Sequence, residues 1–306
     1  MDAATLSPSA RQVGPLERTQ IEHRLGQCAR LPSLGSISSV LCELLNAEHH
    51  YITQVCDVIR RDPSMTTRLL RLVNSVYYGL STPVSSIEEA VFYLGLRQVR
   101  QLATATPIIE DLQKLTGHSA FFWRDFWQHC IATAILTTEI VGYVQPMSDE
   151  MDYVAGLLHD VGKIVMAAEF PDHFAQVRRQ IMAGARDLRV VEREVLGVDH
   201  TELGALYLEH HQLPEAIIET ARWHHQPTRA TAHPQIVAAV HIADLLSRHA
   251  SIGDSGEPAE VSASDWQGAA AWGLLFSEKS EQEKTIATAG LQHSLERLPS
   301  ILEGLV

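Results

Sequence analysis

Apolar residues recur along most of the chain at the three- and four-residue spacing of an amphipathic helix. Between residues 37 and 46, for example, Val40, Leu41, Leu44 and Leu45 fall on one helical face. Almost no stretch alternates between apolar and polar residues as a half-buried β-strand does. The pattern therefore predicts an all-α fold. The longer helices are expected at 17–29, 37–46, 52–60, 64–76, 123–144, 149–169, 173–183, 190–196, 200–210, 214–223, 234–250 and 281–306.

Turn and capping signals divide the chain into four parts. Asp62 and Pro63 indicate an N-cap followed by proline at the first helical position. The run Thr116–His118 is the first break between helical lobes, and the Gly, Ser and acidic residues of Ser251–Pro258 predict a loop. We expect a flexible N-terminus over 1–16, an N-terminal helical lobe over 17–118, a second helical lobe over 119–250, and a loop with a C-terminal helical extension over 251–306.

Composition narrows the class of protein. The 306 residues are 45% hydrophobic and 20% charged, which is typical of a globular protein with a substantial core. A formal net charge of -13 argues against binding to nucleic acid or to an anionic membrane surface. No apolar run is long enough to span a bilayer, and Met1–Pro15 does not resemble a signal peptide. With four cysteines and no CxxC pair, we expect buried thiols and a cytoplasmic location.

Histidines and aspartates interrupt the apolar helical runs of the second lobe. Neutral imidazole and carboxylate are good ligands for first-row metals, and the adjacent His159 and Asp160 could serve one ion or bridge two. If these helices converge, they build a mononuclear or dinuclear centre of the kind that activates water against phosphate esters. The candidate metal ligands are His129, His159, Asp160, His200, His224, His225 and Asp244.

Other polar residues have simpler interpretations. His241 lies three residues before Asp244 and could donate a hydrogen bond to the same centre, but core packing is the preferred interpretation. Glu192 and Glu194 are expected on a solvated helix face. The pair Tyr77 and Tyr78 could be half-buried core, and we expect Tyr78 to be exposed as a partner contact.

The order and spacing of these motifs resemble the HDOD family, HD-related output domains found in bacterial signalling proteins. The resemblance covers roughly residues 20 to 250. It is carried by Leu31–Leu34, Asp62–Met65, Leu69–Ser75, Tyr77–Gly79, Pro83–Ile87, Leu94–Arg97, Phe126–His129, Ala155–Lys163, Val198–Gly204, His224–His225 and His241–Asp244.

This resemblance implies an N-terminal helical lobe packed on an HD-like helical bundle. It also implies roles for the candidate residues. By the order of the HD superfamily, one ion would be held by His129, His159, Asp160 and Asp244. A second ion would be completed by His200, His224 and His225. The cofactor would be one or two divalent transition metal ions, such as Fe, Mn or Zn.

Two residues would be catalytic in an active member of the superfamily. Asp160 would hold the metal, and Lys163 matches a lysine that serves the phosphate or leaving group in the HD-GYP phosphodiesterases. Equally, Lys163 could form a surface ion pair with an acid such as Glu169. HD-GYP enzymes follow their double histidine with Glu and a Gly-Tyr-Pro loop, whereas this chain has Gln226-Pro227 and no Gly-Tyr-Pro.

The resemblance leaves two functions open. The first is a signal-transduction output protein that acts through a signalling partner or a nucleotide ligand. The second is a metal-dependent phosphohydrolase or phosphodiesterase that acts on a nucleotide or cyclic dinucleotide. The missing Gly-Tyr-Pro loop argues against hydrolysis of cyclic di-GMP, while the complete set of candidate ligands keeps an enzyme possible.

Overall fold

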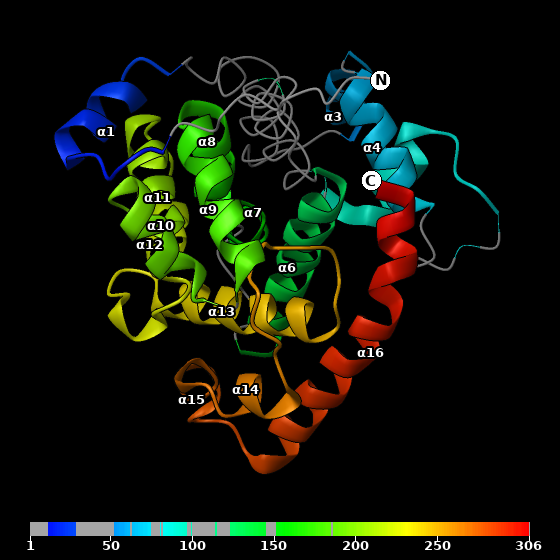
Figure 1. Cartoon of the computed structure of the whole chain (residues 1–306). Helices are drawn as coiled ribbons and strands as arrows, with labels where there is room; N and C mark the ends of the chain where they lie inside the picture. Colours follow the sequence, from blue (N-terminus) through cyan, green and yellow to red (C-terminus); the bar gives the residue numbers. More distant parts are fainter. Residues whose placement is uncertain are drawn as a thin grey trace, which may run out of the picture.

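The computed structural model describes residues 12–28, 52–61, 63–74, 80, 82–96, 99, 114, 123–144, 151–184 and 186–305. This part of the chain is predominantly helical and holds no β-strand, so the predicted all-α fold is confirmed (Figure 1). Five sequence-based expectations lie outside the described residues. They concern the helix at 37–46, the N-cap at Asp62, the break at 116–118, Cys42, and the exposure of Tyr78.

A small hydrophobic cluster lies in the first half of the chain. It is built by helices α3 and α4 and by a helical stretch at 87–96, and it buries residues such as Ile59, Leu69 and Val91. Between α4 and this stretch, the Asn74 side chain exchanges hydrogen bonds with the backbone of Val84 in both directions. The helix bounds here are Ile52–Arg60 for α3 and Pro63–Val73 for α4.

The larger core belongs to a bundle that begins at residue 123. Its centre is the contact of α6 with α7 and α13, flanked by α8, α11 and α12 (Figure 1). The helices are α6 Trp123–Val144, α7 Asp152–Leu158, α8 Val161–Glu169, α9 Pro171–Ala183, α10 Leu188–Leu196, α11 His200–His210, α12 Glu215–Trp223, the 3-10 turn η2 Pro227–Arg229, α13 Pro234–His249, α14 Ala263–Gln267, α15 Ala270–Phe276 and α16 Glu281–Leu305.

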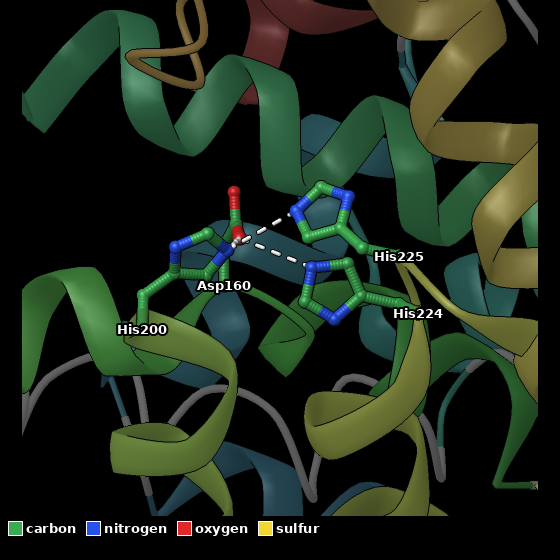
Figure 2. A group of neighbouring side chains, drawn as sticks. All are labelled: Asp160, His200, His224 and His225. Atoms are coloured by element: carbon green, nitrogen blue, oxygen red, sulfur yellow. Dashed lines mark hydrogen bonds and ion pairs between the residues drawn. The ribbon is translucent and has the colours of Figure 1, made fainter. Parts of the chain in front are cut away.

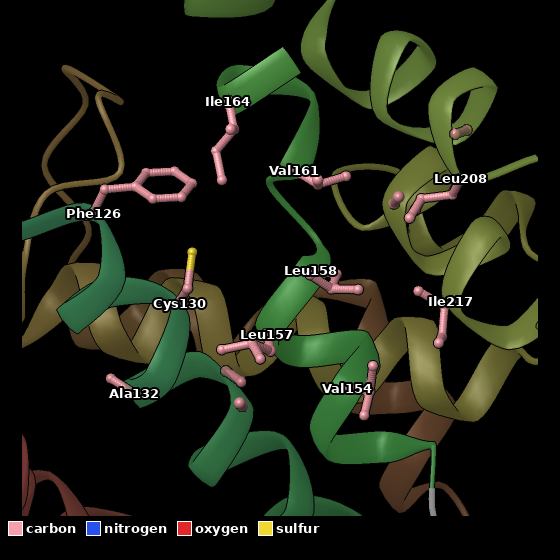
Figure 3. Packing of buried hydrophobic residues seen from close by; sticks show 14 of the residues in the cluster. Phe126, Cys130, Ala132, Val154, Leu157, Leu158, Val161, Ile164, Leu208 and Ile217 are labelled. Carbon is pink, nitrogen blue, oxygen red and sulfur yellow. The ribbon is translucent and has the colours of Figure 1, made fainter. Parts of the chain in front are cut away.

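Apolar side chains from consecutive helices fill the middle of the bundle. Figure 3 shows Phe126 and Cys130 of α6 facing Leu157 and Ile164 from the α7–α8 segment, with Ile217 of α12 on the far side. The cysteines fit the expectation of buried thiols, because Cys28, Cys56 and Cys130 are all buried.

The N-terminal segment packs differently from the expected arrangement. Helix α1, Arg18–Leu25, places Ile21 and Leu25 in the core of the bundle and not in the small cluster. Residues 12–16, expected to be flexible, are held by the bundle as well. The Leu16 amide donates to the Leu196 carbonyl over 2.8 Å, and the Gln176 side chain exchanges two hydrogen bonds with the Val13 backbone.

The C-terminal helix α16 contacts both parts of the molecule. It lies along α6, with Leu291 and Leu298 buried in the bundle core, and its last turns reach α4 (Figure 1). The domain boundaries expected at 16, 118 and 250 stay predictions. Among the residues with described structure, no helix is both long and apolar enough to cross a membrane.

The helix predicted at 149–169 is interrupted. Helix α7 ends at Leu158 and α8 begins at Val161, with His159 and Asp160 at the junction. Asp160 has φ -101° and ψ 15°, which lies outside the regular helical region. The pair of residues singled out in the sequence therefore occupies a break between two helices.

Candidate metal centre

The junction between α7 and α8 orients the central pair of side chains. The His159 Nδ1–H group donates to the Gly156 carbonyl over 2.8 Å, which turns Nε2 of this ring away from its own helix. At the next residue, the backbone bend at Asp160 directs its carboxylate toward α11 and the end of α12 (Figure 2). The break lets two neighbouring residues face one centre, although neighbours on a regular helix diverge by about 100°.

Two glycines bring α11 close to α8. A Cβ atom at Gly162 would lie 1.9 Å from the His200 carbonyl oxygen, and one at Gly204 would lie 3.0 Å from the Gly162 amide nitrogen. A side chain at Gly162 would overlap the backbone of α11, and one at Gly204 would make an unusually tight contact with α8. His200, the first residue of α11, is thereby placed beside Asp160.

The first of two ligand groups joins three helices. His129 of α6, His159 at the end of α7 and Asp244 of α13 each offer a donor atom, and these atoms lie within 4.8 Å of one another. His129 Nε2 is 3.2 Å from Asp244 Oδ1. Arg248, one turn further along α13, lies 3.6 Å from the other oxygen of Asp244.

The second group surrounds Asp160 with three imidazoles. In Figure 2, the rings of His200, His224 and His225 converge on the carboxylate. Asp160 Oδ1 lies 3.4 Å from His200 Nε2 and 3.5 Å from His224 Nε2. His200 Nε2 is 3.2 Å from His225 Nε2.

Asp160 connects the two groups. Its Oδ2 atom lies 3.4 Å from His159 Nε2, while its Oδ1 atom faces the three rings of the second group. The fold brings the seven candidate ligands together in two groups, but Asp160, which the resemblance assigned to the ion of His129, His159 and Asp244, is grouped with His200, His224 and His225. A carboxylate in this position can bind one ion or bridge two.

Several donor atoms of the centre have no hydrogen-bond partner among the described residues, as expected for atoms that bind a metal ion. Buried polar atoms are normally hydrogen-bonded, because an unsatisfied one costs about 1–3 kcal/mol. Within the part of the chain described, several donor atoms of the centre are buried without a hydrogen-bond partner. They are His129 Nε2, His159 Nε2, Asp160 Oδ1, His224 Nε2 and Asp244 Oδ2.

The spacing of these atoms is also suitable. Four donors around an ion at 2.0–2.1 Å in tetrahedral geometry lie about 3.4 Å apart. Four donor pairs, one in the first group and three in the second, are separated by 3.2 to 3.5 Å, and all donors of each group lie within 4.8 Å of one another. The residues therefore fit one or two divalent transition metal ions.

Hydrogen bonds behind the rings fix which nitrogen faces the centre. His200 Nδ1–H donates to Glu192 Oε2 over 2.7 Å, and the His200 amide donates to the same oxygen over 2.9 Å. His224 Nδ1–H donates to the Ala221 carbonyl over 3.0 Å. In each case Nε2 remains available as a ligand.

Glu192 and His241 support the histidine ligands from neighbouring positions. Glu192 was expected on a solvated face, and this is wrong: it is 2% exposed and supports His200. The sequence did hold a signal, since Glu192 shares the apolar face of α10 with Val191 and Val195. His241 is half-buried, and its ring donates to the His224 carbonyl over 2.6 Å, so it supports the turn that carries the histidine pair.

Burial and charge set the protonation of the centre. Burial, aided by His159 and His200 and opposed by Asp160, lowers the pKa of His224 to about 4, so its ring is neutral at pH 7. The pKa of His225 is held well below its ordinary value for the same reasons. Burial opposes ionisation of Asp160, but Lys163 and His159 outweigh it and keep the pKa of this carboxyl well below its usual range. Neutral imidazoles and an ionised carboxylate are the forms that bind metals.

Lys163 belongs to the centre and not to the surface. Its Nζ atom donates to Asp160 Oδ2 over 2.7 Å and to the Ser255 carbonyl over 2.8 Å. The alternative of a surface ion pair with Glu169 is wrong, because Lys163 is buried and Glu169 accepts from the Cys28 thiol. Burial opposes the charge on Lys163, but Asp160 and Glu257 outweigh it and raise its pKa.

A cavity of about 270 Å³ lies beside the centre. The loop 251–258 forms one wall, and Lys163 and Glu192 contribute polar atoms. Sequence reasoning missed Ser255 and Glu257 of this loop, although an acidic loop directly after the helix of Asp244 was a usable signal. The cavity is lined by Phe126, Lys163, Phe174, Val177, Arg178, Ile181, Met182, Leu188, Glu192, Asp254, Ser255, Gly256, Glu257 and Pro258.

The chain matches a known protein family over much of its length. The sequence-family model of the HDOD domain matches residues 31–227 of this chain. The chain belongs to the HDOD family. Its fold matches that of an HDOD domain protein of unknown function from Geobacter sulfurreducens, with a TM-score of 0.80 and 25% identity over 94% of this chain and 97% of that chain.

Two other solved structures share the fold of this HDOD protein at 21% identity. A protein from Shewanella amazonensis, provisionally named a phosphohydrolase, has a TM-score of 0.65 over 94% of this chain and 98% of its own. A protein from Marinobacter aquaeolei, provisionally named a signal transduction protein, has a TM-score of 0.66. The match covers 94% of this chain and 64% of that protein's chain.

One curated relative is an uncharacterized protein of Treponema pallidum. It is 25% identical over 229 residues, which cover 72% of this chain. The matched region spans only 43% of that relative's length, so the relative is much longer than the part the two proteins share.

Proposed function

We propose that this HDOD protein is a signal-transduction protein whose buried metal centre stabilises the conformation that a signalling partner or nucleotide recognises. The observation that carries the proposal is the enclosure of the centre. Six of the seven candidate ligands are no more than 2% exposed. The side chain of the seventh, His225, is 11% exposed and faces Glu257.

The surroundings of the centre favour binding over phosphate chemistry. A phosphohydrolase needs an open coordination position and a cleft that attracts phosphate. Here the adjacent cavity is mainly apolar, and its charged residues include the three carboxylates Glu192, Asp254 and Glu257. Of its two cations, Lys163 is already bound to Asp160. A phosphate group in this cavity would therefore face more carboxylates than cationic side chains.

A second function has one observation in its favour. Asp160 lies between two groups of ligands and has a buried lysine beside it, an arrangement that suits a dinuclear phosphohydrolase. Divalent ions bound there would supply Lewis acidity and an activated water. Lys163 would then orient the phosphate of a nucleotide or cyclic dinucleotide.

Metal content and turnover test the proposal together. Protein purified without a tag and without chelator is expected to hold at least one transition metal ion per chain by elemental analysis. Asp160→Ala should lose the ion, because a charged ligand shared by both groups is removed. Asp265→Ala, which changes an exposed carboxylate of α14, is the control and should keep it.

Turnover decides between the two functions. The same preparations are offered cyclic di-GMP and a generic phosphodiester with Mn²⁺, Fe²⁺ or Zn²⁺, and no hydrolysis is expected. Hydrolysis at a typical enzymatic rate, roughly 1 per second or more, that disappears in Asp160→Ala would establish the phosphohydrolase instead. Wild-type protein without metal would contradict both functions.

A further inference from the structure

The loop 251–258 is fastened to the helix that carries His129. The Asp254 amide donates to the Asp125 carbonyl of α6 over 3.0 Å. Gly253 has φ +67°, and a Cβ atom there would lie 2.2 Å from the Asp125 carbonyl oxygen and 2.5 Å from the His129 amide nitrogen. Only glycine suits both the backbone conformation and the close approach. The loop is therefore fixed at the edge of the centre.

Lys163 fastens the loop at a second point. Its Nζ atom binds the Ser255 carbonyl and Asp160 at the same time, so one side chain connects the loop to the central carboxylate. Residues 253–255 are thus tied to both α6 and α8. Glu257 follows two residues later, and its position is set by these attachments.

The carboxylate of Glu257 points at the second ligand group. Its Oε1 atom is buried, lies 3.6 Å from His225 Nε2 and 3.7 Å from Lys163 Nζ, and has no hydrogen-bond partner among the residues described. A buried carboxylate oxygen without a hydrogen bond is costly. Such an oxygen is normally satisfied by a cation.

We propose that Glu257 is an additional carboxylate ligand of the ion held by Asp160, His200, His224 and His225. The separation between Glu257 Oε1 and His225 Nε2 is 3.6 Å, close to the 3.2 Å between His200 and His225 and the 3.4 Å between His200 and Asp160. Glu257 is not among the donors that all lie within 4.8 Å of one another, so its side chain has to turn further toward the group to bind the ion. Carboxylate oxygen suits the same divalent metals as imidazole.

This inference rests on the proposed metal centre and deepens it. A catalytic site keeps one coordination position for water, whereas a structural site fills its positions with protein ligands. Glu257 would add a fifth protein ligand to the four of this group, from a loop that lies outside the HDOD match at 31–227. Metal binding then fixes the loop, and the loop forms a wall of the adjacent cavity.

Titration of metal-free protein with Zn²⁺ tests the assignment. Glu257→Gln keeps the size of the side chain and removes its charge. One equivalent of Zn²⁺ should bind at least about tenfold more weakly in this variant, by calorimetry, as expected for loss of a group that holds the ion. Glu260→Gln removes an exposed carboxylate three residues away and should titrate like the wild type.

The outcomes separate this inference from the function on which it rests. If the wild type binds Zn²⁺ and Glu257→Gln binds it equally well, the assignment of Glu257 is wrong while the metal centre stands. If Glu257 only balances the charge of Lys163, the variant loses stability without losing metal affinity, which also overturns the assignment. If the wild type binds no Zn²⁺, both proposals fail.

Hydrogen exchange of the unmodified protein tests the assignment of Glu257 as a ligand even if the Glu257→Gln variant does not fold. Addition of Zn²⁺ should slow amide exchange in residues 253–257, by about tenfold or more, because the ion then holds the loop. Exchange in α9, which contributes no ligand, serves as the internal reference. Unchanged exchange in the loop after Zn²⁺ binding would overturn the assignment.

Discussion

At the scale of single residues, the centre depends on how buried charges are balanced. Asp160 and Lys163 are both almost fully buried and contact each other at 2.7 Å. A buried pair of this kind adds little net stability, because removing two charges from water is costly. Loss of one partner is strongly destabilising, because the remaining charge is then buried without compensation.

Lys163→Met should therefore destabilise metal-free protein strongly. The expected loss is about 3–5 kcal/mol in the free energy of unfolding, measured with urea. Lys284→Met, which breaks a surface pair with Glu281, is the control and should cost less than about 1 kcal/mol. Because a bound divalent cation also neutralises Asp160, saturating Zn²⁺ should recover part of the loss. Equal effects of the two substitutions would show that the Lys163 pair is not important for stability.

The ligand types were visible in the sequence, but the roles of Glu192 and Glu257 were not recognised from it. A histidine or aspartate inside an apolar helical run is conspicuous, and the seven candidates converge as expected. Glu192 and Glu257 act through contacts with residues far along the chain, and their local surroundings resemble ordinary acidic surface segments. Only the position of Glu192 on an apolar helix face distinguished it.

At the scale of helices, the fold was largely predictable from periodicity, and the exception lies at the centre. Helices α3, α6 and α11 have the expected bounds. The break at His159 and Asp160 was missed because apolar residues run through it and neither proline nor a capping motif marks it. The break is maintained by tertiary packing of α8 against α11, which a local pattern cannot reveal.

That helix crossing can be tested with one added methyl group. Gly162→Ala should push α11 away from α8, because the new Cβ would meet the His200 carbonyl at 1.9 Å. We expect a loss of about 1–3 kcal/mol in stability, together with weaker metal binding. Gly142→Ala in α6 is the matched control, since nothing lies within 4 Å of its Cβ position, and it should stabilise by about 0.5–1 kcal/mol. Urea unfolding and Zn²⁺ titration measure both effects. Unaltered metal affinity in Gly162→Ala would show that the close crossing does not position His200.

At the scale of the whole molecule, the centre joins helices that are distant in sequence. The candidate ligands come from α6, the α7–α8 junction, α11, the end of α12, and α13. The small cluster around Ile59 and Leu69 contributes none among its described residues. Helix α16 contacts both α6 and α4 and so connects the bundle to the small hydrophobic cluster. A metal that binds only the folded bundle must stabilise it by mass action.

The melting temperature should therefore depend on free metal concentration. At a free Zn²⁺ concentration one hundred times the dissociation constant, the gain is about 2.7 kcal/mol. Removal of metal with a chelator should lower the melting temperature, and amide exchange should accelerate most in α6, α11, α12 and α13. Because α3 and α4 belong to a separate hydrophobic cluster, their exchange should change less. An equal change in α3 and α4 would show that the bundle and the small hydrophobic cluster unfold as one unit, and in that case the state of the metal would be transmitted from the bundle to that cluster.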